Sequence, residues 1–266
     1  MKTKIILLTA MFVISVFAFS TTIIVDKNGG GQFTSIQTAI NNSSTNDTIK
    51  VWPGDYIEQI TLNKDVVLMG SGYENTIIRG NFPSTITMSA GKLMWFLVSS
   101  TGSIGISMSG GIVANCVISN CPNFGIEGTS GTSNVVNCIL YNNGTCGIRG
   151  LATVNATNCI GIGSSDTDFN GAINLSYSRG SSWATSGNQG CIQTDPVFNS
   201  SSDYHISQGS PCWNTGNTSL FDPDGSRSDM GYFGGPDCPI YPTVFEIIIS
   251  PNGNNINLEA KGRANY

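Results

Sequence analysis

Charged side chains are scarce in this sequence. Lys, Arg, Asp and Glu make up 11% of its 266 residues, and there is one histidine. The formal net charge of −5 disfavours nucleic acid and anionic membrane surfaces as partners. A single histidine excludes metal sites built from several histidines. The composition also lacks the strong helix formers of an α-helical enzyme, which excludes a helical bundle.

Motifs of several enzyme classes are also missing. The Gly29-Gly30-Gly31 run lacks the lysine and the spacing of a phosphate-binding loop, so we interpret it as a turn. No Cys-x-x-Cys pair occurs, which disfavours zinc. The single histidine, His205, alternates with Tyr204 and Ile206 in a strand-like run, and no Gly-x-Ser-x-Gly elbow stands in a suitable context. We therefore expect His205 to be a structural or surface residue.

The first twenty residues have the pattern of a secretory signal peptide. Lys2 and Lys4 precede an apolar run over residues 5–19, and Ala18-Phe19-Ser20 fits a small-x-small cleavage site. The run is short for a membrane span, which needs ~20 apolar residues. We expect residues 1–20 to be removed and the protein to be secreted, periplasmic or on the cell surface, with no membrane association after cleavage. In such compartments the 8 cysteines can oxidise.

A repeat runs through the middle of the chain. Gly-Ile pairs and Asn-Cys pairs each recur with a period near 20 residues, and short apolar runs lie between them. The pairs begin at Gly105, Gly125 and Gly147, and at Asn115, Asn137 and Asn158. No unit has room for a crossover helix of ten or more residues. The repeat therefore predicts an all-β parallel β-helix, in which each coil lies ~4.8 Å above the last.

A short amphipathic helix is expected before the first coil. Thr34-Ser35-Ile36-Gln37 has the capping-box pattern, and Ile36, Ala39 and Ile40 follow at helical spacing. The polar run over residues 41–44 ends the pattern. Such a helix would cover the open end of the solenoid, where unpaired strand edges invite association with other chains.

Two segments carry a resemblance to a known group of proteins. The stretch from Gly29 to Ile40, followed by Pro53-Gly54-Asp55-Tyr56, resembles the opening of pectin lyase-like right-handed β-helix proteins, including pectinesterases. Asp195-Pro196-Val197-Phe198 and the stretch from Asp222 to Gly231 resemble the closing segment of secreted bacterial members. The resemblance implies one right-handed parallel β-helix over residues 21–240, with carbohydrate as a ligand. Residues 241–266 then form a tail, either an added strand on the last coil or the start of a further module.

The catalytic residues of the enzymatic members have no counterparts in the coils. Pectinesterases carry paired aspartates with an arginine, whereas residues 85–165 contain Lys92, Glu127 and Arg149 as their only charged residues. Glu127 and Arg149 occupy the same phase one coil apart, so we expect a structural ion pair. An active lyase or esterase would need its acids elsewhere. The residues left for that role are Asp166, Asp168 and Asp195, with Arg179 as a basic neighbour.

The function that we expect is contact with extracellular polysaccharide by a monomer, in a binding or scaffolding role. Abundant Ser, Thr and Asn side chains can bond to sugar hydroxyls, and aromatic rings can stack on sugar rings. The candidate contact residues are Trp52, Tyr56, Trp95, Trp183 and Trp213. Two alternatives stay open: a polysaccharide lyase or esterase acting on a pectin-type substrate, and a structural or adhesive surface protein.

The cysteines fall into groups. Cys116, Cys138 and Cys159 share one phase, and we expect them to be buried free thiols. Cys212 and Cys238 flank the closing loop, and we expect a disulfide between them. The sequence assigns no partner to the remaining three. These are Cys121, Cys146 and Cys191.

One segment resembles the start of a calcium loop. It contains Asp222, Asp224 and Asp229, but it lacks the terminal glutamate of an EF-hand. The alternative is a tight turn in which the carboxylates cap backbone amides or pair with Arg227. No cofactor is expected other than this calcium ion.

Overall fold

The structure is a computed structural model that describes residues 20–81, 83–181, 189–252 and 255–265. The expected signal peptide, apart from Ser20, and Trp183 lie outside the described residues. The described helix, at seven residues, is too short to cross a membrane.

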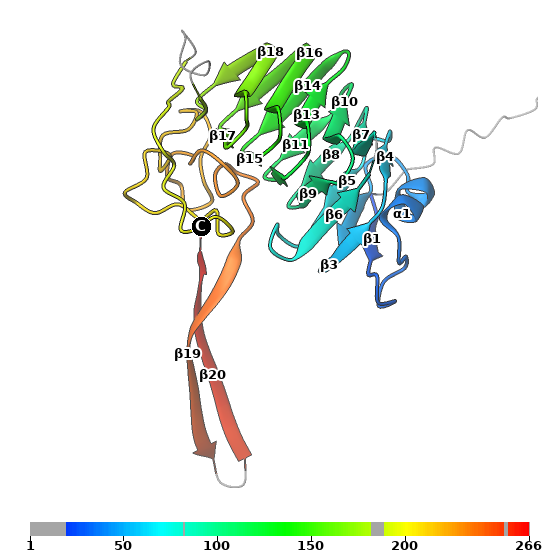
Figure 1. The fold of residues 1–266 in the computed structure, drawn as a ribbon. Coiled ribbons are helices and arrows are strands. Elements are labelled where there is room, and N and C mark those ends of the chain that lie inside the picture. The colour runs from blue at the N-terminus through cyan, green and yellow to red at the C-terminus, as the bar shows by residue number, and fades with distance from the viewer. Residues whose placement is uncertain (1–19, 82, 182–188, 253–254, 266) are drawn as a thin grey trace, which may run out of the picture.

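The chain forms a right-handed parallel β-helix with three faces, as expected (Figure 1). The first face contains β1 (Thr22–Val25), β2 (Thr48–Val51), β5 (Val67–Met69), β8 (Lys92–Met94), β11 (Ile112–Ala114) and β14 (Thr132–Val136). The second face contains β4 (Ile60–Leu62), β7 (Ser84–Met88), β10 (Ile104–Met108) and β13 (Phe124–Gly128). The third face contains β3 (Gly54–Ile57), β6 (Thr76–Gly80), β9 (Leu97–Ser100), β12 (Val117–Ser119), β15 (Ile139–Tyr141) and β17 (Ile160–Ile162).

Two long strands join the first two faces. β16 (Cys146–Thr157) and β18 (Thr167–Ser176) each pass from the second face to the first, so the two faces form one 12-stranded sheet. A register shift after Gly150 marks the corner between the two halves of this pair. The third face is a separate 6-stranded sheet.

The core lies inside the solenoid, where equivalent side chains stack from coil to coil. On the second face the strand pairing aligns one isoleucine from each coil, and all are buried. This column is Ile60, Ile86, Ile106, Ile126 and Ile148. Because a parallel strand that is buried inside a solenoid packs one side on the core, the short apolar alternation in each repeat is enough to fix its register.

The corner between the first and third faces is built from the repeated Asn-Cys pairs. Asn115, Asn137 and Asn158 have φ values of 43°, 50° and 55°, in the left-handed region that asparagine tolerates better than most residues. The cysteines that follow point inward. Cys116, Cys138 and Cys159 are fully buried free thiols.

The N-terminal helix α1 (Ile36–Asn42) packs Ile36, Ala39 and Ile40 against the first coil. Its N-cap is Ser35, whose hydroxyl accepts a hydrogen bond from the Thr38 N–H. The glutamate that serves the first turn comes from the first coil. The Glu58 carboxylate accepts hydrogen bonds from the N–H groups of Ile36 and Gln37, where the helix dipole favours negative charge.

The segment over residues 195–240, called the closing segment below, packs on the outside of the third face. Tyr204, Met230 and Tyr232 contribute to a buried cluster with Val117, Ile139 and Ile160 of the solenoid. The corner asparagines hold its backbone. Asn115 Nδ2 donates to the carbonyls of Tyr232 and Gly234, at 2.7 and 2.8 Å, and Asn137 Nδ2 donates to those of Asp229 and Gly231, at 3.0 and 3.2 Å.

The tail forms an antiparallel hairpin. β19 (Tyr241–Asn252) pairs with β20 (Asn255–Asn265), and among the described strands neither pairs with the solenoid (Figure 1). The tail is therefore not an added strand on the last coil.

Candidate functional site

A groove follows the outer surface of the first face where the end of the closing segment meets it. Two adjoining hollows of about 280 and 530 Å³ form the groove, and they share Met69, Trp95 and Ile240. Trp52 and Lys50 line the smaller hollow, and Lys92 and Asp237 line the larger. We call it the tryptophan groove.

Strand alternation supplies the floor of this groove. Ile49, Leu68 and Leu93 point into the core, so the residues on either side of them point outward. The pairing then aligns Lys50 with Met69 and Met94 across three coils. Flexible thioethers beside an ammonium group make a surface that is apolar in its centre and charged at its edge.

The two tryptophans stand at the corner that follows the first face. Trp52 comes directly after β2, and its side chain is 46% exposed. Trp95 comes directly after β8 and has a φ of 67°. Its indole Nε1 donates to the carbonyl of Asp237 at 2.7 Å, which joins the closing segment to the solenoid.

The charges in the groove differ in their partners. Lys92 Nζ lies 2.6 Å from the Asp237 carboxylate, so the two charges neutralise each other. This ion pair also holds the closing segment against the first face. Lys50 is exposed and has no ion-pair or hydrogen-bond partner among the described residues. Its three donors are free for a ligand.

Two of the five predicted aromatic contacts do not belong to this groove, and a third is not among the described residues. Tyr56 is 3% exposed, and its hydroxyl donates to the Trp52 carbonyl at 3.0 Å, so the prediction that it stacks on a sugar is wrong. The physical reason is that the alternation of β3 turns Tyr56 into the core. Trp213 is half-buried in the closing segment and does not line the groove, and Trp183 lies outside the described residues.

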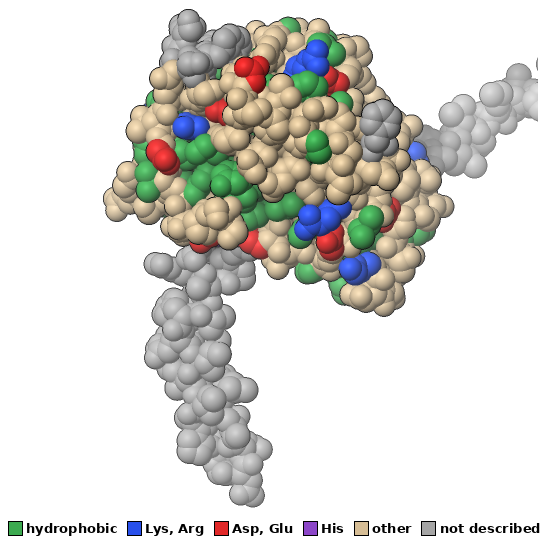
Figure 2. Space-filling model, viewed as in Figure 1, with side chains coloured by type: hydrophobic (Ala, Val, Ile, Leu, Met, Phe, Trp, Pro, Cys, Tyr) green, Lys and Arg blue, Asp and Glu red, His purple; other side chains and the backbone are tan. Residues whose placement is uncertain are grey.

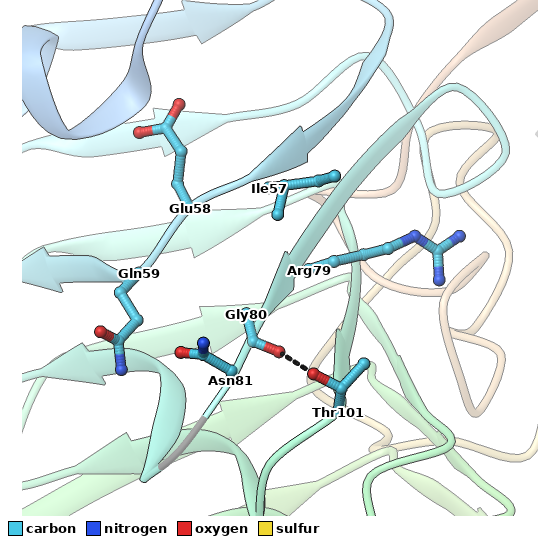
Figure 3. A pocket seen from close by; sticks show the side chains of 7 residues that line it. All are labelled: Ile57, Glu58, Gln59, Arg79, Gly80, Asn81 and Thr101. Atoms are coloured by element: carbon cyan, nitrogen blue, oxygen red, sulfur yellow. Dashed lines mark hydrogen bonds between the residues drawn. The ribbon is translucent and has the colours of Figure 1, made fainter.

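A hollow of about 360 Å³ lies where the third face turns into the second (Figure 3). Ile57, which is 82% exposed, and the side chains of Gln59, Asn81 and Thr101 line it. Its charged groups are engaged elsewhere. Glu58 bonds to helix α1, and Arg79 Nε pairs with the Asp55 carboxylate at 2.9 Å.

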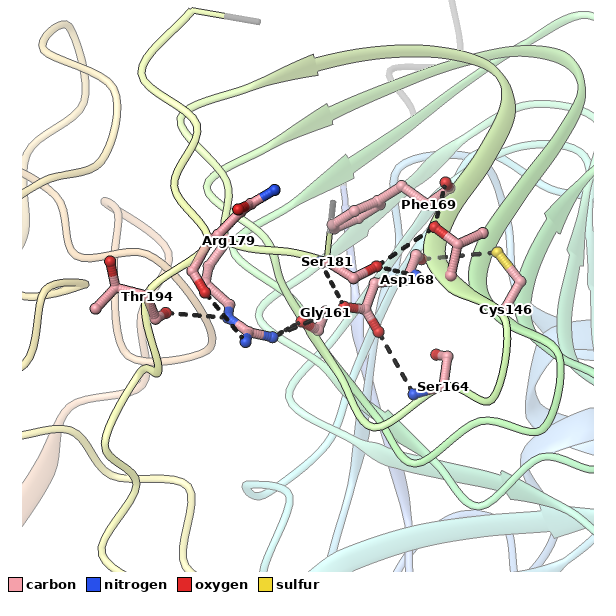
Figure 4. Close-up of polar contacts among 10 residues, drawn as sticks. Cys146, Gly161, Ser164, Asp168, Phe169, Arg179, Ser181 and Thr194 are labelled. Carbon is pink, nitrogen blue, oxygen red and sulfur yellow. Dashed lines mark hydrogen bonds and ion pairs between the residues drawn. The ribbon is translucent and has the colours of Figure 1, made fainter. Parts of the chain in front are cut away.

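Asp168 and Arg179, which the sequence left as candidates for a catalytic role, contact each other in a buried position instead of in a groove (Figure 4). Arg179 Nη1 lies 3.7 Å from Asp168 Oδ2, and the two side chains are 12% and 4% exposed. Asp168 also accepts from the Ser181 N–H at 2.8 Å, while Arg179 donates to the carbonyls of Gly161 and Thr194. These bonds connect the last coil to the segment that follows it, so the role of the pair is structural.

The other two aspartates of that set are exposed. Asp195 Oδ1 accepts a hydrogen bond from the Val197 N–H at 2.8 Å. Asp166 directly precedes strand β18. Of the three, Asp168 is the one that pairs with Arg179 within the described chain.

The calcium-loop aspartates accept hydrogen bonds from backbone N–H groups. Asp222 accepts from Gly235 and Asp229, Asp224 accepts from Ser226, and Asp229 accepts from Asn214. The described residues contain no group of three or more His, Cys, Asp or Glu side chains placed to hold a metal ion. This arrangement matches the tight-turn alternative that the sequence left open.

Two of these carboxyls are buried and titrate abnormally. Desolvation raises the pKa of Asp222 to about 6 and that of Asp229 to about 7. The negative charge of Asp224 raises both pKa values further, and that of Asp222 also raises the pKa of Asp229. Both lie in the part of the closing segment that the corner asparagines hold.

The predicted disulfide is not formed in the structure. Cys212 and Cys238 are both buried free thiols. Burial raises the pKa of each to about 12, which keeps them protonated and unreactive towards thiol exchange. Cys212 packs against the third face with Met230, whereas Cys238 lines the tryptophan groove, so the closing segment directs the two thiols to different places.

Glu127 and Arg149 do form an ion pair. The two residues are directly paired between β13 and β16, and Arg149 Nη1 lies 3.4 Å from Glu127 Oε1. The guanidinium also lies over the Phe124 ring, 4.7 Å from its centroid. His205 Nδ1 lies 2.6 Å from the Asp203 carboxylate, and its ring stacks on Phe233.

Comparisons with known proteins show distant similarity to solved structures. Neither a protein-family model nor a curated protein matches the sequence. Among solved structures, the chain is similar to a pectin methylesterase from carrot, with 17% identity and a TM-score of 0.46 over 70% of this chain and 62% of that one. It is also similar to the pectin methylesterase PemA from Erwinia chrysanthemi, with 14% identity and a TM-score of 0.39 over 62% of this chain and 56% of that one.

The chain has a parallel β-helix fold. Its parallel strand pairing shows this directly, coil by coil, and confirms the fold that the resemblance implied. The chain spans less than two thirds of the length of either solved structure.

Proposed function

We propose that the protein is exported and binds polysaccharide outside the cell, with the tryptophan groove as its binding site. The observation that carries this proposal is that two of the predicted stacking residues, Trp52 and Trp95, line one groove beside the unengaged Lys50. No reasoning from the repeat alone would bring these three residues together with the end of the closing segment.

The chemistry of the groove suits a sugar chain. A pyranose ring has one or two faces rich in C–H groups, which pack on an indole, and a rim of hydroxyls, which need hydrogen-bond partners. Trp52 and the half-buried Met69 offer the apolar surface, and Lys50 offers three donors. The two hollows adjoin along the solenoid, so the groove accommodates several consecutive sugar units more readily than one small molecule.

The partners of the charged groups support binding in preference to hydrolysis. Cleavage by paired carboxylates requires two carboxyl groups about 5 to 9 Å apart across the scissile bond. Among the residues that line the tryptophan groove, Asp237 supplies the carboxylate, and Lys92 neutralises it at 2.6 Å. A binding or scaffolding role fits that arrangement.

A polysaccharide array with the purified protein tests the proposal, scored both for retention and for release of unsaturated or demethylated product. We expect retention without product, and a loss of about tenfold or more in affinity for Trp52→Ala, which corresponds to ~1.4 kcal/mol. Leu151→Ala is the matched control, because Leu151 is also a large exposed side chain, at 56%, but lies outside the groove. Product release would establish an enzyme, and neither retention nor product would favour an adhesive surface protein.

A further inference from the structure

A further hollow, separate from those described above, lies on the other side of the closing segment, over the third face. Its volume is about 600 Å³, and it combines the ends of two solenoid strands with the start of the closing segment. β15 contributes Tyr141, β17 contributes Ile162, and the closing segment contributes Asp195, Val197 and Phe198. None of these residues lines the tryptophan groove.

The surface of this hollow is apolar. Figure 2 shows hydrophobic side chains gathered where the closing segment meets the β15 and β17 end of the third face. Val197 is 53% exposed, and Tyr141, Ile162 and Phe198 are half-buried. An apolar patch of this kind, bordered by polar groups, is typical of a binding surface.

The two aromatic rings are fixed from below. Tyr204 is buried, and its ring centroid lies 5.1 Å from that of Tyr141 and 5.4 Å from that of Phe198. Because the support lies on the core side, the rings present their remaining surface to solvent without further ordering. Such preorganisation lowers the entropy cost of binding.

Val197 has an unusual backbone. Its φ is 53°, which is a true outlier for a β-branched residue, and the Asp195 carboxylate fixes it by accepting the Val197 N–H at 2.8 Å. Strain of this kind concentrates at ligand-binding sites. Here the strained side chain is exposed, so burial in the core does not compensate for it.

Polar groups border the apolar surface. The Asp195 carboxylate uses one oxygen for the Val197 N–H, which leaves its second oxygen to accept bonds from a ligand. Ser200 and Ser201 lie on the same side. Asp195 is the charged residue that lines this hollow, so an anionic ligand is disfavoured.

We propose that this hollow is a second sugar site, which holds a terminal or internal pyranose of a neutral polysaccharide. Tyr141 and Phe198 pack against its C–H face, and Asp195 accepts hydrogen bonds from adjacent hydroxyls. The ligand class rests on the proposed function, but the residues are separate. Two sites on one chain make the protein bivalent, so that it links polysaccharide chains as well as binding them.

Calorimetric titration with cellohexaose, mannohexaose and xylohexaose tests this proposal. We expect the wild-type protein to bind at least one of them at two sites per chain. Ser201→Arg fills the hollow from an exposed position, and Asp195→Asn keeps an acceptor for the Val197 N–H while removing the carboxylate charge. Each variant should reduce the stoichiometry to one, as should Trp52→Ala, and thermal melting checks that each variant is folded. Leu151→Ala should retain both sites.

The outcomes separate the two proposals. One site per chain that only Trp52→Ala abolishes overturns the second site and leaves the tryptophan groove. One site that only Ser201→Arg and Asp195→Asn abolish overturns the groove and supports the second site. Binding to none of the three hexasaccharides, with retention on the array through Trp52, overturns the second site alone.

Discussion

Asn137 shows how one residue can serve both the coil and the segment outside it. Its backbone makes the corner with a φ of 50°, and its buried side chain donates to the Asp229 and Gly231 carbonyls. We expect Asn137→Ala to destabilise the protein by about 1 to 3 kcal/mol, because it leaves buried acceptors unsatisfied.

Asn137→Gly separates the two roles of the residue. Glycine tolerates the left-handed backbone but lacks the amide, so its loss of stability should be smaller than that of the alanine variant. Denaturant unfolding of both variants measures the difference. Equal and unchanged midpoints in the two variants would refute the role assigned to this corner.

For individual residues, prediction from the sequence succeeded where the repeat determines which positions are equivalent from coil to coil. It put Asn115, Asn137 and Asn158 at equivalent positions and placed Glu127 opposite Arg149. It failed for Tyr56, because a single strand of four residues does not reveal which side faces the core. The hydrogen-bond partners of the corner asparagines could not be predicted from the sequence either, because they lie in a segment that only tertiary packing brings close.

At the scale of elements, the closing segment should respond to pH. Asp222 and Asp229 have folded-state pKa values of about 6 and about 7, above the ordinary 3.8. A raised acid pKa means that the folded state binds protons more tightly, so this contribution to stability is complete below pH 3.8 and is lost as the pH rises through 6 and 7.

We therefore expect the closing segment to become less stable as the pH rises from about 4 to about 7. Hydrogen exchange of its backbone amides, measured across that range, reports the change locally. Asp229→Asn keeps an oxygen for the Asn214 N–H and should reduce the dependence to the part that Asp222 contributes. A dependence of unchanged size in this variant would show that another group is responsible.

The elements themselves follow from the sequence to different degrees. The short strands and the N-terminal helix were expected, because their apolar spacing and turn residues are local signals. The cap differs in detail, since Ser35 is the N-cap and the stabilising carboxylate comes from Glu58, more than twenty residues away. The irregular path of the closing segment has no periodicity from which to predict it.

At the scale of the whole molecule, we expect no dependence on calcium. The three aspartates of the calcium-like loop accept backbone N–H groups. Removing metal ions with a chelator should leave the melting temperature unchanged, because there is then no bound ion whose loss destabilises the folded state. A fall in melting temperature that added calcium reverses would contradict this.

The period of the repeat was sufficient to predict the solenoid, since each coil has only its neighbours to pack against. The tryptophan groove was not predictable as a site. Trp95 and Asp237, which form its wall, lie 142 residues apart in the chain, and the repeat ends before the closing segment begins. Composition pointed to the tryptophans, but only the packing of that segment selected two of them.

The most direct test of the groove uses the indole N–H signals of the protein in a two-dimensional nitrogen–proton NMR spectrum. The chain has 4 tryptophans, so each signal can be assigned with a single substitution. On titration with an oligosaccharide of the polysaccharide retained on the array, the signals of Trp52 and Trp95 should shift together and saturate, while that of Trp213 stays in place. Saturable binding that leaves both Trp52 and Trp95 unshifted would contradict the account.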